Sequence, residues 1–251
     1  MYKGYHFTGI VLASGSGKRM KADVAKQFIH LHDKPMVYYS LKAFAESPVD
    51  SIVLVTTDGD VEYCLDEIVA KLKLPKVDKI VVGGDERYQS SINGVLASPA
   101  NTDYVLIHDS ARPCLTRELI ISCMDGVIEY GNCTTAVKVV DTICQVNEEN
   151  KIGGIPNRNY LWSVQTPQCF TYDDIKEAGQ CLLKELPVMS DSQRSAITDD
   201  VWVVRKFLEK DVFVVEGSYD NIKVTNPADV KRAEEILVRG KEEEKRKRGR
   251  K

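Results

Sequence analysis

The stretch IVLASGSGKRM, residues 10–20, decides the fold class that we expect for this 251-residue chain. A short apolar run passes into a glycine-rich turn with two adjacent cations, and Lys26 follows a few residues later. Glycines after a strand let backbone N–H groups approach a polyphosphate closely, and cations neutralise its charge. The stretch therefore predicts a buried strand that ends in a phosphate-binding loop at residues 13–17.

Two better-known phosphate-binding motifs do not match this loop. A P-loop requires Ser or Thr after Gly17 and Lys18, and this chain has Arg19 there. A dinucleotide-binding fingerprint requires a third glycine for helix–strand packing, and this chain has Met20 instead. A glycine-rich turn alone is often only a turn, but the three nearby cations, Lys18, Arg19 and Lys26, favour phosphate binding.

Composition bounds the class of protein. Hydrophobic residues make up 43% of the chain and charged residues 28%, which is typical of a soluble globular domain. The net charge of −3 gives no reason to expect nucleic acid or an anionic membrane as a partner. The seven cysteines are scattered and form no C-x-x-C pair, so neither a zinc site nor a disulfide framework is expected. Without an apolar run of spanning length or a signal peptide, we expect a cytoplasmic protein with reduced thiols.

Apolar, β-branched runs alternate with helical patterns over the first half of the chain. Strands are expected at Thr8–Ala13, Ser51–Thr57, Lys79–Val82 and Asp103–His108. Helices are expected at Met36–Ala45, where Pro35 precedes the first turn, and at Val61–Leu72, Ser90–Ala97 and Arg117–Tyr130. This alternation predicts an α/β fold with a mostly parallel sheet and helices on both faces.

The segment from Thr134 to Ile155 breaks this rhythm. Strand pieces at Thr134–Val140 and Thr142–Val146 precede a polar turn, so a β excursion fits better than another βα unit. After it we expect a strand at Trp162–Thr166, helices at Tyr172–Leu186 and Thr198–Leu208, a strand at Asp211–Glu216, and a last helix with Asn226 as N-cap and Pro227 at its first position. The chain is interpreted as one domain, residues 1–236, with a charged tail at 237–251 that we expect to be a solvated helix end.

Three further loops follow predicted strands, and ligands of open α/β sheets bind at the carboxyl ends of strands. In GGDERYQSS, residues 83–91, Asp85 and Ser90 have the chemistry to bond a base or sugar, although Ser90 alone would be interpreted as a helix N-cap. In the loop at residues 218–225, Lys223 is a lone cation in an apolar-leaning stretch, and it gains meaning only together with the other loops.

The loop HDSARP, residues 108–113, follows a very apolar strand. A carboxylate at such a strand end is well placed to hold Mg²⁺ beside phosphates, which makes Asp109 the candidate metal ligand. A structural ion pair between Asp109 and Arg112 is the simpler alternative, and both interpretations are compatible. We expect His108 to pack at the strand end rather than to act as a base.

With these motifs in place, the chain closely resembles the 2-C-methyl-D-erythritol 4-phosphate cytidylyltransferase family. The resemblance runs in order from Gly9 to Ile236, through LASGSGKRM, KQF, GGDER, HDSARP, VVDTI, PNRNYLWSVQTPQCF, TDD and VEGSYDNIKVTNPADV. It implies a Rossmann-like fold with a β-arm that exchanges across a homodimer, and the segment at 134–155 is the natural arm.

The resemblance also implies a reaction. The phosphate of a polyol phosphate would attack the α-phosphorus of CTP and expel pyrophosphate, which asks the protein for positioning and charge neutralisation. Arg19 and Lys26 would stabilise the pentacoordinate phosphorus, and Lys223 would contact the α-phosphate region. The residues that would hold cytidine and triphosphate are Ala13, Ser14, Gly15, Ser16, Gly17, Gly84, Asp85 and Ser90, with Asp109 serving the ribose or Mg²⁺. The residues that would bind methylerythritol phosphate are Thr142, Arg158, Thr166 and Asp220, the first two delivered by the partner subunit.

The chain departs from the family pattern at a few positions. Ser14 stands where the family usually has Ala or Gly, Ala25 where it has Pro, and Ser110 where it often has Ala. None of these changes removes a functional side chain. They bear on specificity rather than on the type of reaction.

Other functions stay open at this point. A sister family that uses ribitol 5-phosphate shares most of these motifs; Leu161, Trp162, Ala111 and residues 198–200 favour methylerythritol phosphate, whereas residues 155–158 and Ser110 look more like the sister group. An NAD-binding oxidoreductase would need the missing third glycine. A non-catalytic nucleotide sensor would not need to keep all of the cations.

Overall fold

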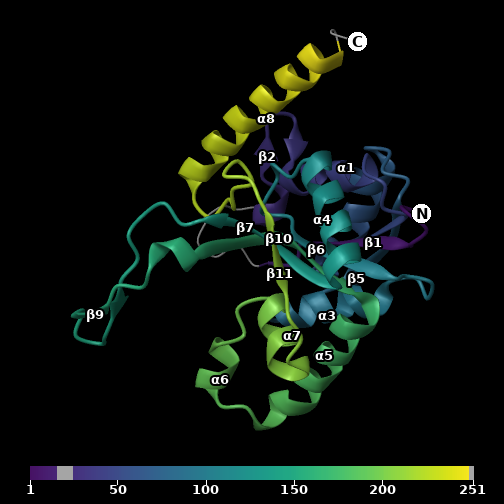
Figure 1. Cartoon of the computed structure of the whole chain (residues 1–251). Helices are drawn as coiled ribbons and strands as arrows, with labels where there is room; N and C mark the ends of the chain where they lie inside the picture. Colours follow the sequence, from purple (N-terminus) through teal and green to yellow (C-terminus); the bar gives the residue numbers. More distant parts are fainter. Residues whose placement is uncertain (16–24, 249–251) are drawn as a thin grey trace.

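A mostly parallel seven-stranded sheet forms the centre of the computed structural model, which describes residues 1–15 and 25–248 (Figure 1). In spatial order the strands are β11 (Phe213–Glu216), β7 (Asn132–Lys138), β10 (Trp162–Thr171), β6 (Tyr104–Asp109), β1 (Phe7–Leu12), β4 (Ser51–Thr56) and β5 (Val77–Val82). Strand β10 is antiparallel to both of its neighbours, and every other pair in the sheet is parallel. The expected fold class is confirmed.

Helices cover both faces of this sheet. Their bounds are α1 (Met36–Ala45), α2 (Val61–Tyr63, continued by π-helical turns at Cys64–Ala70), α3 (Arg87–Ala97), α4 (Arg117–Tyr130), α5 (Tyr172–Glu185), α6 (Asp191–Ser195), α7 (Asp200–Leu208) and α8 (Pro227–Arg248). Helices α1 and α4 pack with the 64–70 turns on one face, and α3, α5 and α7 pack on the other. Along β1, Val11 faces the first layer and Ile10 the second, which is the alternation expected of a strand buried on both sides. Within the described residues no helix is long and apolar enough to cross a membrane.

Two glycines allow the layers to approach closely. A Cβ atom on Gly9 of β1 would lie 2.8 Å from the ring of Phe44, the buried aromatic residue of α1. A Cβ atom on Gly94 of α3 would lie 2.5 Å from Ile10 and 2.9 Å from Val55. At Gly9 the Phe44 ring of α1 thus reaches the backbone of β1, and at Gly94 side chains of the sheet reach the backbone of α3.

Several element boundaries differ from those expected. Strand β10 continues to Thr171 instead of ending at Thr166, with an irregularity in its register between Val164 and Gln168. Helix α3 begins at Arg87, and its N-cap is Glu86, so the interpretation of Ser90 as an N-cap is wrong.

The last helix, α8, begins at the expected residue but extends into the segment expected to be a tail. Asn226 accepts a hydrogen bond at 3.1 Å from the N–H of Asp229, which confirms it as the N-cap of α8. Helix α8 runs without a break through residue 237, where the charged tail was expected to start, and continues to Arg248.

A long excursion leaves the sheet after β7 and returns at β10 (Figure 1). Its outer part is a hairpin of β8 (Gln145–Val146) and β9 (Ile152–Gly154), which projects away from the body of the molecule. Residues 134–138 of the expected arm belong to β7 inside the sheet, so we define the arm as residues 139–161. Its apolar side chains are largely exposed, including Tyr160 at 82% and Ile155 at 65%.

Candidate active site

A cleft of about 960 Å³ lies at the carboxyl ends of the parallel strands. Loops after β1, β4, β5, β6 and β11 line it, which includes all four loops singled out in the sequence. The polar side chains and glycines that line it are Ser14, Gly15, Lys26, Gln27, Thr57, Asp58, Gly83, Gly84, Asp85, Glu86, Arg87, Ser90, Asp109, Ser110, Lys223 and Thr225. Segments far apart in the sequence therefore meet where ligands of open α/β sheets bind.

Ser90 fastens the loop after β1 to the loop after β5. Its hydroxyl lies 2.8 Å from the hydroxyl of Ser14 and accepts a hydrogen bond at 3.1 Å from the N–H of Gly84. A Cβ atom on Gly83 would lie 2.7 Å from the Ser90 hydroxyl, so only glycine fits here without displacement. Two glycine-rich turns thus form one wall of the cleft, with Asp85 exposed at its rim.

The first loop is only partly described. Ser14 and Gly15 line the cleft, whereas Ala13 is buried and its N–H donates to the Val55 carbonyl at 2.7 Å. The expected phosphate ligands Ser16 and Gly17 and the expected catalytic Arg19 lie outside the described residues.

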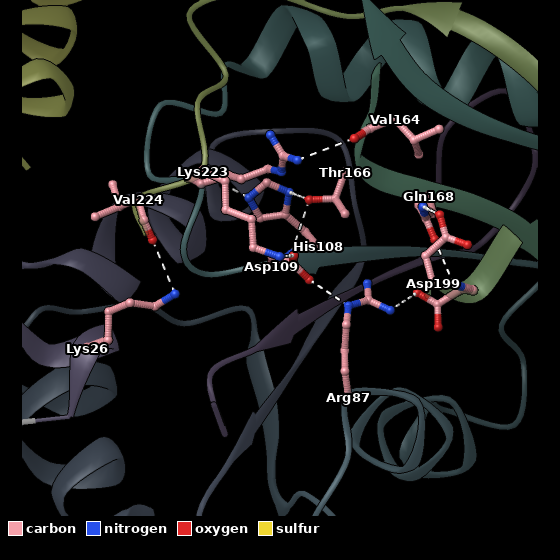
Figure 2. A network of polar contacts seen from close by, with 12 residues as sticks. Lys26, Arg87, His108, Asp109, Val164, Thr166, Gln168, Asp199, Lys223 and Val224 are labelled. Carbon is pink, nitrogen blue, oxygen red and sulfur yellow. Dashed lines mark hydrogen bonds and ion pairs between the residues drawn. The ribbon is translucent and has the colours of Figure 1, made fainter. Parts of the chain in front are cut away.

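Asp109 is the buried anion at the floor of the cleft (Figure 2). Its Oδ2 accepts a hydrogen bond from Lys223 at 2.7 Å, and its Oδ1 accepts one from Arg87 at 3.0 Å. Burial alone would raise the pKa of Asp109, but the charges of Arg87 and Lys223 outweigh it and hold that pKa well below its usual range. Asp109 is therefore a carboxylate with one cation on each oxygen.

The expected ion pair between Asp109 and Arg112 is replaced by other contacts. The Arg112 guanidinium turns to the loop after β11 and donates to the Asn221 carbonyl at 2.8 Å. Asn221 is fully buried, and its side-chain amide donates to the Thr166 carbonyl at 2.8 Å. Arg112 and Asn221 together fix the loop that carries Lys223 against β10.

His108 packs at the strand end, as expected. Its ring is fully buried beside Phe44, and its Nδ1 lies 2.9 Å from the Thr166 hydroxyl. Burial lowers the pKa of His108 to about 4. The imidazole is thus neutral near pH 7. Its Nε2 lies 3.1 Å from the Arg112 carbonyl, a contact that helps to hold the loop after Asp109 in place.

The four residues expected to bind the polyol phosphate lie in three places. Thr166 is buried, and its hydroxyl accepts a hydrogen bond from the Asp109 N–H at 3.2 Å. Asp220 pairs with Arg239 of α8 at 2.6 Å. Thr142 and Arg158 are exposed on the arm, where Arg158 donates to the Val140 carbonyl at 2.7 Å beside a smaller cavity of about 400 Å³. None of these four residues lines the large cleft of the described chain.

Other residues of the cleft were not singled out from the sequence. Arg87 stands inside the GGDER motif, and its guanidinium reaches both Asp109 and the buried Asp200 of the TDD motif. Thr57 and Asp58 follow β4, which is the same strand-end signal that identified the other loops. Burial would lower the pKa of Arg87, but the carboxylates of Asp200 and Asp109 outweigh it and raise that pKa.

Fold and site together define a Rossmann-like α/β protein whose cleft, at the carboxyl edge of its sheet, is lined by glycine-rich turns and by Lys26 and Lys223. A profile of the family described as "IspD: 2-C-methyl-D-erythritol 4-phosphate cytidylyltransferase" matches residues 7–239. The chain belongs to this family.

Curated relatives and solved structures agree with this assignment. The 2-C-methyl-D-erythritol 4-phosphate cytidylyltransferase of Lachnoclostridium phytofermentans is 40% identical over 230 residues, which are 92% of this chain and 95% of the relative. The enzyme of the same name from Lachnospira eligens is 41% identical over 224 residues, 89% of this chain and 95% of the relative. The crystal structure of 4-diphosphocytidyl-2C-methyl-D-erythritol synthase from Anaerococcus prevotii superposes with a TM-score of 0.78 at 26% identity and covers 94% of this chain and 99% of that one.

Proposed function

We propose that this protein transfers CMP from CTP to 2-C-methyl-D-erythritol 4-phosphate, giving 4-diphosphocytidyl-2-C-methyl-D-erythritol and pyrophosphate, a step in the synthesis of isoprenoid precursors. Membership of the family supports the reaction and the choice of acceptor. The observation that carries the proposal is the charge arrangement of the cleft, where Lys26 and the paired Lys223 and Asp109 line the same space as the glycine-rich turns. Such a site suits a nucleoside triphosphate, because its cations meet the phosphates and its carboxylate is available to a ribose hydroxyl or a cation.

The proposed reaction needs positioning more than covalent chemistry. The acceptor phosphate attacks the α-phosphorus of CTP in line, the bond to the bridging oxygen breaks, and pyrophosphate leaves with the electron pair. Negative charge gathers on the equatorial oxygens in the transition state. Lys26 and Lys223, which line the cleft, are proposed to neutralise it there. Arg19 is proposed to share this role because of the resemblance to the family.

Recognition of the nucleotide is proposed for the wall formed by the turns after β1 and β5. Ser90 is hydrogen-bonded to both Ser14 and Gly84, so the wall, which includes Gly15, is preorganised. Asp85, exposed at the rim, has acceptor oxygens for the amino group of a cytosine base. The ribose is proposed to lie over Asp109.

A divalent cation such as Mg²⁺ fits the donor chemistry at Asp109. No group of three or more His, Cys, Asp or Glu side chains within residues 1–15 and 25–248 is arranged to hold a metal ion. Mg²⁺ does not require one, since it is commonly held by one or two carboxylates together with substrate phosphates. Each Asp109 oxygen accepts a hydrogen bond from one cationic side chain and retains acceptor capacity for such an ion. When bound, the ion would neutralise charge on the triphosphate.

The arm supports a homodimer in which each arm completes the site of the other subunit. Its apolar side chains, among them Val140, Ile152 and Tyr160, are more than half exposed in the single chain. Exposed apolar surface of this kind marks an interface. Because Thr142 and Arg158 stand on the same segment and away from the cleft, we propose that they bind the acceptor in the partner's cleft.

A reducing, cytoplasmic location is part of the proposal. All seven cysteines are free thiols, and five of them are buried. Free thiols on this scale are typical of the cytoplasm, where disulfides are rare.

Pyrophosphate release with CTP and either methylerythritol phosphate or ribitol 5-phosphate tests the proposal. We expect turnover with the first acceptor and little with the second. Turnover with ribitol 5-phosphate alone would replace the acceptor, and CTP binding without turnover on any acceptor would favour a nucleotide sensor.

A further inference from the structure

The two cations on Asp109 are held in different ways (Figure 2). Lys223 comes from a loop, and its side chain is 40% exposed at the cleft. Arg87 is the first residue of helix α3, and its side chain is 27% exposed. Its guanidinium makes a second ion pair, from Nη1 to Oδ2 of Asp200 at 2.8 Å. Lys223 is therefore held at the cleft by one ion pair, whereas the Arg87 guanidinium is held by two.

Asp200 is anchored more firmly than either cation. It is 2% exposed, it opens helix α7, and its N–H donates to the side chain of Gln168 in β10 at 2.9 Å. Displacing Arg87 would break two ion pairs at once and leave the buried Asp200 carboxylate without its cation, which is strongly unfavourable. Displacing Lys223 leaves Asp109 still paired with Arg87, so the structure permits the second movement and opposes the first.

The proposed function requires that movement. Lys223 donates to Asp109 in the described structure, yet it is the cation proposed to meet the α-phosphate. The Lys223 ammonium group is held beside Asp109 by the carboxylate. A bound triphosphate carries more negative charge than this carboxylate and would compete with it for the ammonium group. A second cation on Asp109 removes the penalty of letting Lys223 go.

We propose that Arg87, held by Asp200, is a positioning residue that keeps the Asp109 carboxylate compensated and in place while Lys223 transfers to the phosphates of CTP. This inference rests on the proposed function, in which CTP occupies the cleft. In this inference the charge chain Asp200–Arg87–Asp109–Lys223 does more than stabilise the fold. It allows Lys223 to leave Asp109 for the phosphates of CTP.

This charge chain predicts that the effect of removing Lys223 on CTP binding depends on whether Arg87 is present. In an Arg87→Met variant, Lys223 becomes the principal cation of Asp109 and stays bound to it, so CTP loses its lysine contact. Removing Lys223 from the Arg87→Met variant should therefore weaken CTP binding little further. If Arg87 only stabilised the fold, its loss would lower the fraction of active enzyme and kcat, and would leave the KM for CTP unchanged.

The test compares Arg87→Met, Arg87→Lys, Asp200→Asn, Lys223→Met and the double variant Arg87→Met with Lys223→Met. Arg205→Met is the matched control, because Arg205 also pairs with a carboxylate, Asp211, but neither residue lines the cleft. For each protein we would measure kcat, the KM for CTP, and the dissociation constant of CTP by calorimetry without acceptor. Circular dichroism and thermal unfolding report whether each variant is folded.

We expect Arg87→Met to raise the KM and dissociation constant for CTP about tenfold or more, the size expected for loss of a charged hydrogen bond. Arg87→Lys restores part of the loss, Asp200→Asn shows a smaller rise, and Arg205→Met stays at the wild-type value. The double variant is expected to bind CTP within about threefold of Arg87→Met, because coupled residues are not additive.

Three outcomes overturn the inference: CTP binding by Arg87→Met within about twofold of wild type, purely additive effects of Arg87 and Lys223, or a change in kcat alone. If Arg87→Met does not fold, Arg87→Lys and Asp200→Asn decide the question by the same readouts. Failure of the proposed function looks different, because the wild type would then bind CTP without releasing pyrophosphate on any acceptor. The calorimetric comparison still decides the role of Arg87 in that case, and absence of CTP binding by the wild type overturns both proposals.

Discussion

The Lys26 ammonium donates a hydrogen bond to the main-chain carbonyl of Val224 at 3.2 Å, across a separation of 198 residues in the sequence. Val224 directly follows Lys223, so the two lysines proposed for the transferred phosphate meet at one loop. A neutral carbonyl is a weaker partner for an ammonium group than a phosphate oxygen. Lys26 is thus poised to exchange this contact for one with the substrate.

Lys26→Ala is expected to reduce kcat far more than CTP affinity. The cation is proposed to act on charge that develops in the transition state, so kcat should fall on the order of 10²–10³-fold while the dissociation constant of CTP changes by less than about tenfold. Steady-state kinetics and calorimetry measure the two quantities. Lys79→Ala is the matched control, because Lys79 also donates to a main-chain carbonyl but lies outside the cleft. An unchanged kcat would refute the role given to Lys26.

Mixed dimers test whether the arm completes the partner's site. Lys26→Ala disables the cleft of its own subunit, whereas Arg158→Ala is expected to disable the partner's site. Mixing the two inactive proteins should restore about a quarter of wild-type activity, because half of the dimers are mixed and each of these has one intact site. Mixing Lys26→Ala with a Lys26→Ala, Arg158→Ala double variant should restore none. Equal failure of both mixtures would mean that each site belongs to one chain.

Asp174 provides a pH-dependent test of stability away from the cleft. It accepts hydrogen bonds from Lys210 at 2.6 Å and from Asn132 at 2.8 Å. Burial would raise the pKa of Asp174, but these two partners outweigh it and lower that pKa. The contribution of ionised Asp174 to the free energy of unfolding is therefore complete above its unfolded-state pKa of about 3.9. It is lost as the pH falls through the lower folded-state pKa.

Asp174→Asn should reduce the free energy of unfolding by about 1 kcal/mol at pH 7, and the difference should shrink below about pH 4. Urea unfolding across this range measures it. Asp173→Asn is the control, because Asp173 shares the first turn of α5 but is exposed. A difference that grows on acidification would contradict the assignment.

Gly94 tests the close packing of α3 on the sheet. Gly94→Ala should lower the free energy of unfolding by about 1–3 kcal/mol, because the new methyl group would overlap Ile10 and Val55. Gly240→Ala in α8, where a Cβ atom meets nothing within 4 Å, should instead stabilise by up to about 1 kcal/mol through helix propensity. Thermal unfolding of both variants checks the contrast, and an equal response of the two would sink the packing explanation.

The parts of the fold that follow from local signals were predicted well from the sequence. Helices Met36–Ala45 and Arg117–Tyr130 have the expected bounds, since Pro35 precedes the first and Gly131, at φ +80°, ends the second. Strand β10 was cut short in the prediction because Pro167 looks like a strand breaker. In the structure Pro167 lies within the register irregularity, where the ladder does not need an N–H.

The site was predictable as a set of loops, but its pairings were not. Spacing along the chain suggested Arg112, three residues away, as the partner of Asp109. The observed partners, Arg87 and Lys223, are 22 and 114 residues away, and only the order of the strands brings them together. Arg87 stands inside the GGDER motif, but no local signal indicates its partners, because Asp200 comes from a helix in the other half of the sequence.

The reversed direction of β10 determines where the arm can act. Because β7 runs parallel to the strands of the cleft and β10 runs against them, the chain leaves the sheet after Lys138 and re-enters at Trp162 on the same side as the ligand loops. A parallel β10 would have required the chain to cross to the other side before re-entering. One antiparallel strand thus turns a connection between neighbours into a limb that extends from the edge of the sheet where the cleft lies, as the proposed exchange of arms requires.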